Sequence, residues 1–355
     1  MSLYIASVPM DCGSSCMGPG YLPRKMCSRQ AIASDGQTQG TETIIGTSQE
    51  AHMAPETKAK PQVAIMNAVH DLPVLVARDK GFFRDEGLDL EFVTTPGMAQ
   101  VTTSHTVKFD SVFERPLDSV YNEGGIDCYR MCEWGIMKRA VEANAHGLRG
   151  RKIVALGASM SKFAIVVARD SKIYEPEMLK DKPIAVTPNN GSEFTTLKMM
   201  EGFLAPEHVK RITLGSMLKR LEAVRDGKVA AASVMEPWIS VAQKWGMRIL
   251  IESHSTRSEA AGDDLDGPTL ARMFRAQARA VELLEKDPTP FVHYLARETG
   301  GLLEPHELAT WRLLHAAPQP YTRERFDDTY AWTVKWNMTV PGATYANTVD
   351  NRAWQ

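Results

Sequence analysis

The residues best suited to binding chemistry lie in short polar segments that follow apolar runs. The most informative segment is Asn189 to Thr195, which leads into a predicted helix over Glu193 to Leu204. The first backbone N–H groups of a helix have no partner inside it, so these groups and nearby hydroxyls could hold an anion without a full positive charge. Ser192 could also be only the N-cap of the helix. The expected ligand-binding residues of this segment are Asn190, Gly191, Ser192 and Thr195.

Two further segments pair a glutamate with a tryptophan. Glu133 and Trp134 follow a predicted strand, where Trp134 could stack on a ligand and Glu133 could bind a cationic or hydroxyl group. A surface tryptophan beside a solvated glutamate is the alternative interpretation. Glu236 and Trp238 flank Pro237, which restricts the turn between them, so we expect both residues to line the opposite wall of a cleft.

A histidine and two serines complete the set of candidate ligand-binding residues. His70 follows the first predicted strand and stands next to Asp71, which could orient its imidazole ring. A lone histidine can instead be a hydrogen-bonded structural residue. Ser159 and Ser161 lie in a predicted loop over Gly157 to Lys162.

The cysteines do not predict catalysis or metal binding. The five cysteines are an odd number, which does not suggest a disulfide framework. Zinc sites usually hold two pairs at tighter spacing than Cys128 and Cys132 show, so we interpret these two as structural thiols. We therefore expect no catalytic residue, no metal and no cofactor.

The elements that must position these residues alternate between strands and helices. In the stretch from His70 to Gly97, a helix over Leu72 to Lys80 is expected to stop at Gly81, and Leu88 to Phe92 alternates at the period of a strand. With the preceding apolar run, this stretch predicts a strand–helix–strand unit with a parallel sheet. Further strands are expected at 126–131, 152–156, 163–168, 184–186, 211–214, 230–235 and 249–251. Further helices are expected at 117–123, 136–145, 217–226, 239–244, 269–285 and 304–314.

This alternation is typical of an α/β protein with mostly parallel sheets. In open α/β sheets a ligand lies beyond the carboxyl ends of the strands. The loops at 67–71, 132–134, 159–161 and 189–195 meet that description, and 236–238 would close the other side. The sequence therefore predicts one ligand cleft built from these loops.

Composition bounds the class of protein. With 355 residues, the chain is long enough for two lobes and an appendage. A net charge of −2 does not indicate a nucleic-acid partner, and no apolar run is long enough to span a membrane. Residues 1–60 lack periodicity and are rich in small polar residues, so we expect a disordered or non-native extension. The start of the chain shows no basic segment followed by an apolar core, as a secretory signal would.

The segment from Ala77 to Leu90 carries the pattern A-x-x-x-G-F-F-x-x-x-G-L-x-L. This pattern resembles the first unit of the NMT1/THI5-like and sulfonate/nitrate/taurine-type solute-binding proteins. The resemblance implies a type II periplasmic-binding fold, in which two α/β lobes with mostly parallel sheets are joined by a two-strand hinge. We expect lobe I at 61–168 and 249–330, lobe II at 169–248, and a C-terminal tail at 331–355. The hinge strands are expected near 163–171 and 248–253.

The resemblance implies a monomeric receptor that captures a small organic anion, of the sulfonate or carboxylate class, for an ABC permease. In that family the helix start equivalent to Gly191-Ser192 contacts the anionic head of the ligand. The family implies a periplasmic location, whereas the visible N-terminus, if genuine, implies a cytoplasmic one. The alternative is a cytosolic enzyme on the same fold, of desulfinase-like or pyrimidine-synthase-like type. The loop over Met66 to Pro73 lacks the nucleophilic cysteine of the desulfinases, and the pair Cys128 and Cys132 does not reproduce the cysteine cluster of the synthases.

Overall fold

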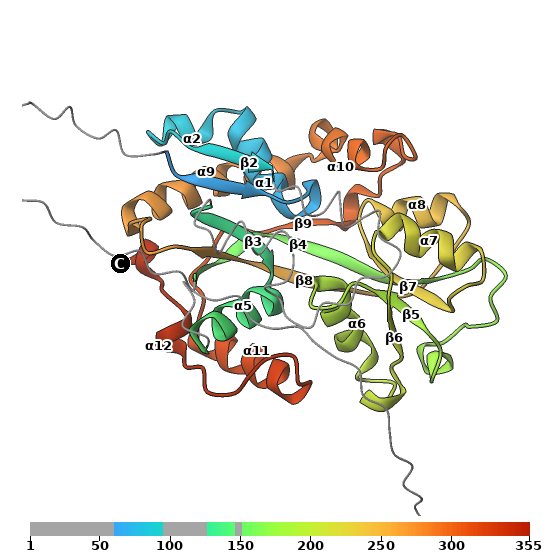
Figure 1. Cartoon of the computed structure of the whole chain (residues 1–355). Helices are drawn as coiled ribbons and strands as arrows, with labels where there is room; N and C mark the ends of the chain where they lie inside the picture. The colour runs from blue at the N-terminus through green and yellow to red at the C-terminus, as the bar shows by residue number, and fades with distance from the viewer. Residues whose placement is uncertain (1–59, 95–125, 146–150) are drawn as a thin grey trace, which may run out of the picture. The chain divides into compact units, whose positions relative to one another are not determined.

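The computed structural model describes residues 60–94, 126–145 and 151–355. The predicted N-terminal extension, apart from its last residue, and the predicted helix at 117–123 lie outside the described residues. The described strands form one hydrogen-bonded sheet in the order β2-β1-β3-β8-β4-β7-β5-β6, with β9 beside β4 (Figure 1). They are β1 Gln62–Ile65, β2 Glu91–Thr94, β3 Cys128–Cys132, β4 Lys152–Val167, β5 Ile184–Val186, β6 Arg211–Thr213, β7 Ala231–Met235, β8 Arg248–Ala261 and β9 Leu313–His315.

The predicted strand–helix–strand unit is present. β1 and β2 pair in parallel, and helices α1 (Ala68–Asp79) and α2 (Phe82–Asp85) connect them. Gly81 separates the two helices in the left-handed conformation, with a φ of 78°, which a residue without Cβ adopts at little cost. The prediction that α1 begins at Leu72 was wrong. Asn67 caps the helix by accepting a hydrogen bond from the backbone N–H of His70, so His70 and Asp71 belong to its first turn.

The long strands β4 and β8 are the main departure from expectation. The predicted loop at 157–162 is absent, because β4 runs through it and pairs antiparallel with β8 along most of its length. The register shifts between Leu156 and Met160, so this part of β4 is a bulge rather than a loop. β8 likewise extends far beyond the predicted return strand at 249–251.

These two strands are shared by both halves of the sheet. β1, β2 and β3 pair in parallel on one side of them, and β5, β6 and β7 pair in parallel on the other. The hydrogen-bonded ladder therefore continues from one half of the sheet to the other. A continuous antiparallel pair connects them, and the mostly parallel arrangement holds within each half.

The helices of the second half lie close to their predicted positions. They are α6 Gly191–Met200, α7 Met217–Arg225 and α8 Trp238–Lys244, and α9 follows at Gly267–Lys286. The predicted helix at 304–314 was wrong, because Pro305–Glu307 and Thr310–Arg312 form separate 3-10 turns that lead into β9. No helix in the described ranges is long and apolar enough to cross a bilayer.

The C-terminal segment is part of the packed structure. Helix α11 (Arg323–Lys335) crosses the expected boundary at residue 330 and packs, with α12 (Tyr345–Thr348), against α5 (Glu133–Ala145). Between these helices and the sheet lies one of the two cores, which includes Met131, Ile136 and Tyr321. The remaining named helix, α10 (His293–Glu298), packs against α1.

Candidate functional site

The strand ends that the sequence assigned to a ligand cleft meet at the middle of the sheet. Gly191, the first residue of α6, packs against the first half of the protein. A Cβ at this position would lie 3.1 Å from Cζ of Phe163 and 3.5 Å from Cβ of Cys132. Cys132 is the last residue of β3 and lies opposite Arg257 on β8. Directly paired residues of neighbouring strands project from the same face, so α6, Cys132 and Arg257 surround one region.

Arg257 is the residue in this region that sequence reasoning missed. Its side chain is 1% exposed, its Nε donates to the hydroxyl of Ser161 at 3.1 Å, and its guanidinium lies 5.9 Å from the ring of Phe163. Within the part of the chain that the structure describes, neither Nη1 nor Nη2 meets an acceptor at hydrogen-bonding geometry. The thiol of Cys132 lies beside it, and sulfur is a weak acceptor. Burial lowers the pKa of Arg257 to about 10, so the group stays charged at neutral pH.

No sequence signal singles out Arg257. Every residue from Glu252 to Glu259 of β8 is polar, so this run shows no period-two alternation of polar and apolar side chains. The fold nevertheless buries Ser255 and residues 257–261, so this end of the polar run faces the interior of the protein.

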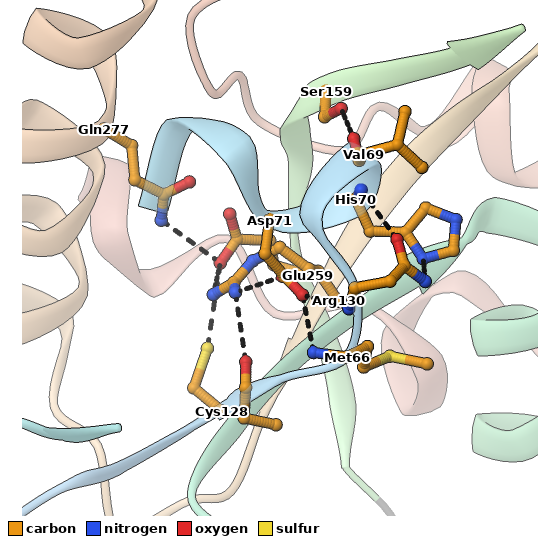
Figure 2. A network of polar contacts seen from close by, with 11 residues as sticks. Met66, Val69, His70, Asp71, Cys128, Arg130, Ser159, Glu259 and Gln277 are labelled. Atoms are coloured by element: carbon orange, nitrogen blue, oxygen red, sulfur yellow. Dashed lines mark hydrogen bonds and ion pairs between the residues drawn. The ribbon is translucent and has the colours of Figure 1, made fainter. Parts of the chain in front are cut away.

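His70 lies in the first turn of α1, and its ring is buried. The Nδ2 atom of Asn67 lies 2.7 Å from His70 Nδ1, while Oδ1 of Asn67 accepts from the His70 backbone N–H (Figure 2). Burial, and then the charges of Arg257 and Arg130, hold the pKa of His70 well below its usual value. Its Nε2 atom has no hydrogen-bond partner in the described ranges. The expectation that Asp71 orients this ring was wrong.

Asp71 instead belongs to a buried ion network beside the site. Its Oδ1 accepts from Arg130 at 2.8 Å, and its Oδ2 accepts from the backbone N–H of Met66 at 2.6 Å (Figure 2). Arg130 also pairs with Glu259 at 3.4 Å. Burial and the Glu259 carboxylate raise the pKa of the Cys128 thiol to about 12, so this cysteine is protonated. The network fixes the start of α1 and therefore the position of His70.

The start of α6 differs from prediction in its cap. Asn190, rather than Ser192, is the N-cap, and its side chain accepts from the Ser192 backbone N–H at 3.2 Å. The Ser192 hydroxyl is turned back and accepts from the backbone N–H of Thr187 at 2.9 Å. Thr195 lies one turn after Gly191 and on the same side of the helix. Its buried hydroxyl has no partner among the residues that the structure describes.

Arg220 supports this helix start from behind. Its side chain is 2% exposed, and its Nη2 donates to the hydroxyl of Thr187 and to the carbonyl of Gly215. Nη1 donates to the carbonyl of Ser233 at 2.7 Å. Burial lowers the pKa of Arg220 to about 9. All of these acceptors are neutral, so the charge of Arg220 adds to the positive potential beneath α6.

Glu133 and Trp134 are engaged within the protein. Glu133 is buried, and its carboxylate accepts two bonds from Arg325, at 2.8 and 2.6 Å, and one each from Tyr321 and Thr329. These donors saturate the carboxylate, so the expected contact with a ligand is not supported by its geometry. The ring of Trp134 packs between Phe194 of α6 and Trp332 of α11 at centroid distances of 6.2 and 5.4 Å.

Four other predicted residues have structural partners. Ser159 donates to the carbonyl of Val69 at 2.9 Å, and Ser161 accepts from Arg257. Glu236 is fully buried and accepts from Ser240 at 3.1 Å and from Arg312 at 3.3 Å. Trp238 begins α8 and packs partly buried against the larger core. Of these four, only Ser161 touches a group at the centre of the site.

The arrangement suits an anion better than a metal. The described residues contain no cluster of three or more His, Cys, Asp or Glu side chains that could hold a metal ion. The unpaired polar atoms near Arg257 include its Nη atoms, the Nε2 atom of His70 and the hydroxyls of Thr195 and Ser255, and two residues further along β8 the Oε1 atom of Glu259 is also unpaired among the described residues. A guanidinium with hydroxyl and N–H donors is a typical site for a carboxylate or another oxyanion.

Comparison with solved structures identifies the fold. The alkanesulfonate-binding protein SsuA from Xanthomonas axonopodis pv. citri, bound to MOPS, is 17% identical, with a TM-score of 0.63 over 82% of this chain and 98% of that chain. The zinc-bound ligand-binding component of an ABC-type import system from Staphylococcus aureus is 12% identical, with a TM-score of 0.61 over 84% and 98%. The desulfurization enzyme DSZB is 12% identical, with a TM-score of 0.54 over 83% and 98%.

These likenesses show that the chain has a periplasmic-binding-protein-like fold, as the sequence predicted. No protein-family model matches the chain, and comparison with curated proteins gives no significant match. The same fold carries both binding proteins and an enzyme, so function has to be argued from the site.

Proposed function

We propose that the chain is the solute-binding protein of an ABC importer and captures a small organic anion in the cleft between two lobes. The observation that carries this proposal is the buried charge of Arg257, whose two Nη atoms lack an acceptor in the described part of the chain. A buried charge without a partner is unfavourable, and an anionic ligand would supply the missing one. The ligand class is that of sulfonates and carboxylates.

The proposed lobes are residues 61–168 with 249–330, and residues 169–248. The start of α6 comes from the second lobe, whereas Cys132 and His70 come from the first. A ligand held by Arg257 would therefore contact both lobes, which is how a two-lobed receptor couples binding to closure. The SsuA protein bound to MOPS gives a precedent for a sulfonate ligand on this fold. A periplasmic location, a monomeric state and an ABC permease partner belong to the same proposal.

A second candidate function is an enzyme of desulfinase-like type. It is favoured by the position of Cys132, a thiol beside a guanidinium in a fold shared with a desulfurization enzyme. A nearby positive charge can stabilise the thiolate that acts as a nucleophile. Against it, the thiol lies at the end of the strand β3 and not in the loop over Met66 to Pro73, where the resemblance to the desulfinases would place the nucleophile.

One experiment separates the two functions. The purified chain is screened by thermal shift against alkyl and aryl sulfonates, sulfinates, carboxylates and nitrate, and each hit is titrated by calorimetry. The ligand is then recovered and identified by mass spectrometry. A receptor gives saturable binding and returns the ligand unchanged. Conversion of a sulfinate, lost in a Cys132→Ser variant, would favour the enzyme, and absence of binding across the panel would contradict the receptor.

A further inference from the structure

We infer that a stripe of residues on α6 and two tryptophans of the C-terminal helix α11 form a latch that holds the two halves of the protein together. The stripe consists of Gly191, Phe194, Lys198 and Glu201, and its partners lie on β3, α5 and α11. The latch rests on the two lobes of the proposed function, but not on the identity of the anion, and it adds a device that controls the separation of those lobes.

The spacing of the stripe places its residues on one face of the helix. They stand at intervals of three, four and three residues, and residues three or four apart are neighbours on a helix surface. The stripe runs from Gly191, the first residue of α6, to Glu201, its C-cap. Because a single helix carries all four residues, a movement that pulls one of them away from its partner pulls the others as well.

The inner half of the stripe packs on β3 and α5. A Cβ on Gly191 would lie 3.5 Å from the Cβ of Cys132. The ring of Phe194 is fully buried and stacks on the ring of Trp134, with an angle of 28° between the ring planes. Trp134 also contacts Trp332, at a centroid distance of 5.4 Å, and so links α6 to α11. The contact between the halves therefore begins beside the expected cleft and continues outward along α6.

The outer half of the stripe is held by the C-terminal helix. The Oε2 atom of Glu201 accepts from the indole N–H of Trp332 at 2.9 Å and from that of Trp336 at 3.2 Å. The ammonium of Lys198 lies 5.5 Å from the centre of the Trp332 ring and donates to Oε1 of Glu201 at 2.6 Å. Burial opposes ionisation of Glu201, but the hydrogen bonds from Lys198 and the two indoles outweigh it and lower the pKa of this carboxyl. The acceptor is therefore charged at neutral pH, which strengthens its hydrogen bonds.

Helix α11 is itself anchored to the first half. Arg325 and Thr329 both donate to the buried carboxylate of Glu133 at the start of α5, and α11 packs against that helix (Figure 1). Trp332 and Trp336 follow on the same helix and reach the second half at Glu201. The C-terminal segment therefore connects the halves outside the sheet, in addition to the strands β4 and β8.

Separation of the halves at the cleft requires the latch to open. Gly191 and Cys132 face each other at its inner end, so widening the gap between them draws the same face of α6 away from Trp134 and α11. The latch thus stabilises the arrangement in which Cys132 and Arg257 are buried. Weakening it at Glu201, at the opposite end of α6, should expose the Cys132 thiol in the ligand-free protein.

The test measures the alkylation of two buried thiols by iodoacetamide in the ligand-free, full-length protein. Peptide mass spectrometry assigns the rate to each site. Cys132 reports on the inner end of the latch. Cys128, which is fully buried and donates to Glu259, reports on unfolding of the surrounding fold. Each rate is expressed relative to the same thiol in the wild type, so differences in intrinsic reactivity cancel.

The variants are Glu201→Ala, Trp332→Phe and Trp336→Phe, and the two phenylalanine variants keep an aromatic ring but lose the indole N–H. Glu177→Ala, which removes an exposed glutamate of the second half, is the matched control. We expect Cys132 to be alkylated about three- to tenfold faster in Glu201→Ala than in the wild type. Each tryptophan variant removes one of the two bonds and should give a smaller increase, and the control should give none.

The ratio of the two thiols determines the interpretation. Cys128 should keep its wild-type rate in every variant. A Cys132 rate that stays at the wild-type level in Glu201→Ala would overturn the inference. Equal acceleration of both thiols would also overturn it, because the contact would then stabilise the whole fold instead of holding the halves together. These measurements need no ligand, so a failure of the wild type to bind sulfonates or carboxylates would contradict only the proposed function.

Discussion

The hydroxyl of Ser159 donates to the carbonyl oxygen of Val69 at 2.9 Å, joining the bulge of β4 to the first turn of α1 (Figure 2). Pro73 explains why this oxygen needs an outside donor. Proline has no N–H, so it cannot bond the carbonyl four residues earlier in a helix, and for Pro73 that carbonyl belongs to Val69. Ser159 therefore completes a helix that carries His70.

Replacing Ser159 tests this structural role. Ser159→Ala leaves the Val69 carbonyl without its donor, and we expect the free energy of unfolding to fall by about 1–3 kcal/mol. Denaturant unfolding monitored by circular dichroism measures this loss. The sulfonate Kd should change little in the folded variant. A Kd that rises sharply with no loss of stability would show that Ser159 contacts the ligand directly.

Ser192 and Thr195 lie on the same helix, α6. We expect removal of the Ser192 hydroxyl to lower the stability of the protein, and removal of the Thr195 hydroxyl to lower its affinity for the anion. Ser192→Ala breaks the bond from the Thr187 backbone N–H and should cost about 1 kcal/mol of stability with little loss of affinity. Thr195→Val keeps the shape of the side chain but removes an unpaired hydroxyl, so it should weaken anion binding and leave the ligand-free protein no less stable. Thermal unfolding gives the stability of each variant, and calorimetric titration gives the Kd of each variant for the anion. The reverse pattern would return Ser192 to the site and assign Thr195 to packing.

We predict that Glu133 stabilises the fold and does not contribute to ligand affinity. Glu133→Ala leaves Arg325, Tyr321 and Thr329 without their shared acceptor. Loss of one partner of a buried ion pair lowers the free energy of unfolding by about 3–5 kcal/mol. For Glu133→Ala we expect a loss of about 3 kcal/mol or less, because Arg325 can turn toward solvent. Glu324→Ala, on the exposed face of α11, is the control. A folded Glu133→Ala protein with strongly reduced affinity would contradict this assignment.

Two histidines are held neutral in the folded protein and should lower its stability as the pH falls, whereas Glu298, whose pKa is raised by burial to about 7, acts in the opposite direction. Burial lowers the pKa of His315 from 6.5 to about 4, and the pKa of His70 is also held well below 6.5. At these two histidines the unfolded chain then binds more protons than the folded one between these values, so their contribution to stability is full above about pH 6.5 and is lost toward pH 4. The full shift of His315 would be worth about 3 kcal/mol, and less is expected since its ring is only partly buried.

Chemical denaturation at several pH values checks this dependence. The His315→Gln variant should show a flatter curve than the wild type over this range, because the proton uptake linked to His315 is removed. Identical slopes for the two proteins would show that His315 does not contribute.

The local signals in the sequence predicted most of the second half correctly, including α7, α8 and the strands β5 to β7. These local signals failed where contacts with residues far along the chain determine the structure. The polar run at 157–162 resembles a loop, yet pairing with β8 makes it strand. From the sequence, Glu133 resembles a ligand-binding residue. The fold brings Arg325 and Tyr321, almost two hundred positions later in the chain, into contact with its carboxylate.

Arg257 could not be singled out from the sequence for a related reason. An arginine in a polar run is most often solvated, and only the pairing of β8 between β3 and β4 buries it. That its Nη atoms meet no acceptor in the described part of the chain is a property of the fold rather than of neighbouring residues.

The most direct measurement is a crystal structure of the protein with a bound alkylsulfonate. We predict headgroup oxygens about 2.7–2.9 Å from both Nη atoms of Arg257, with the Nε2 atom of His70 donating to the same headgroup. A headgroup bound away from Arg257, or an Arg257 whose Nη atoms pair with a protein carboxylate in the complex, would contradict the account.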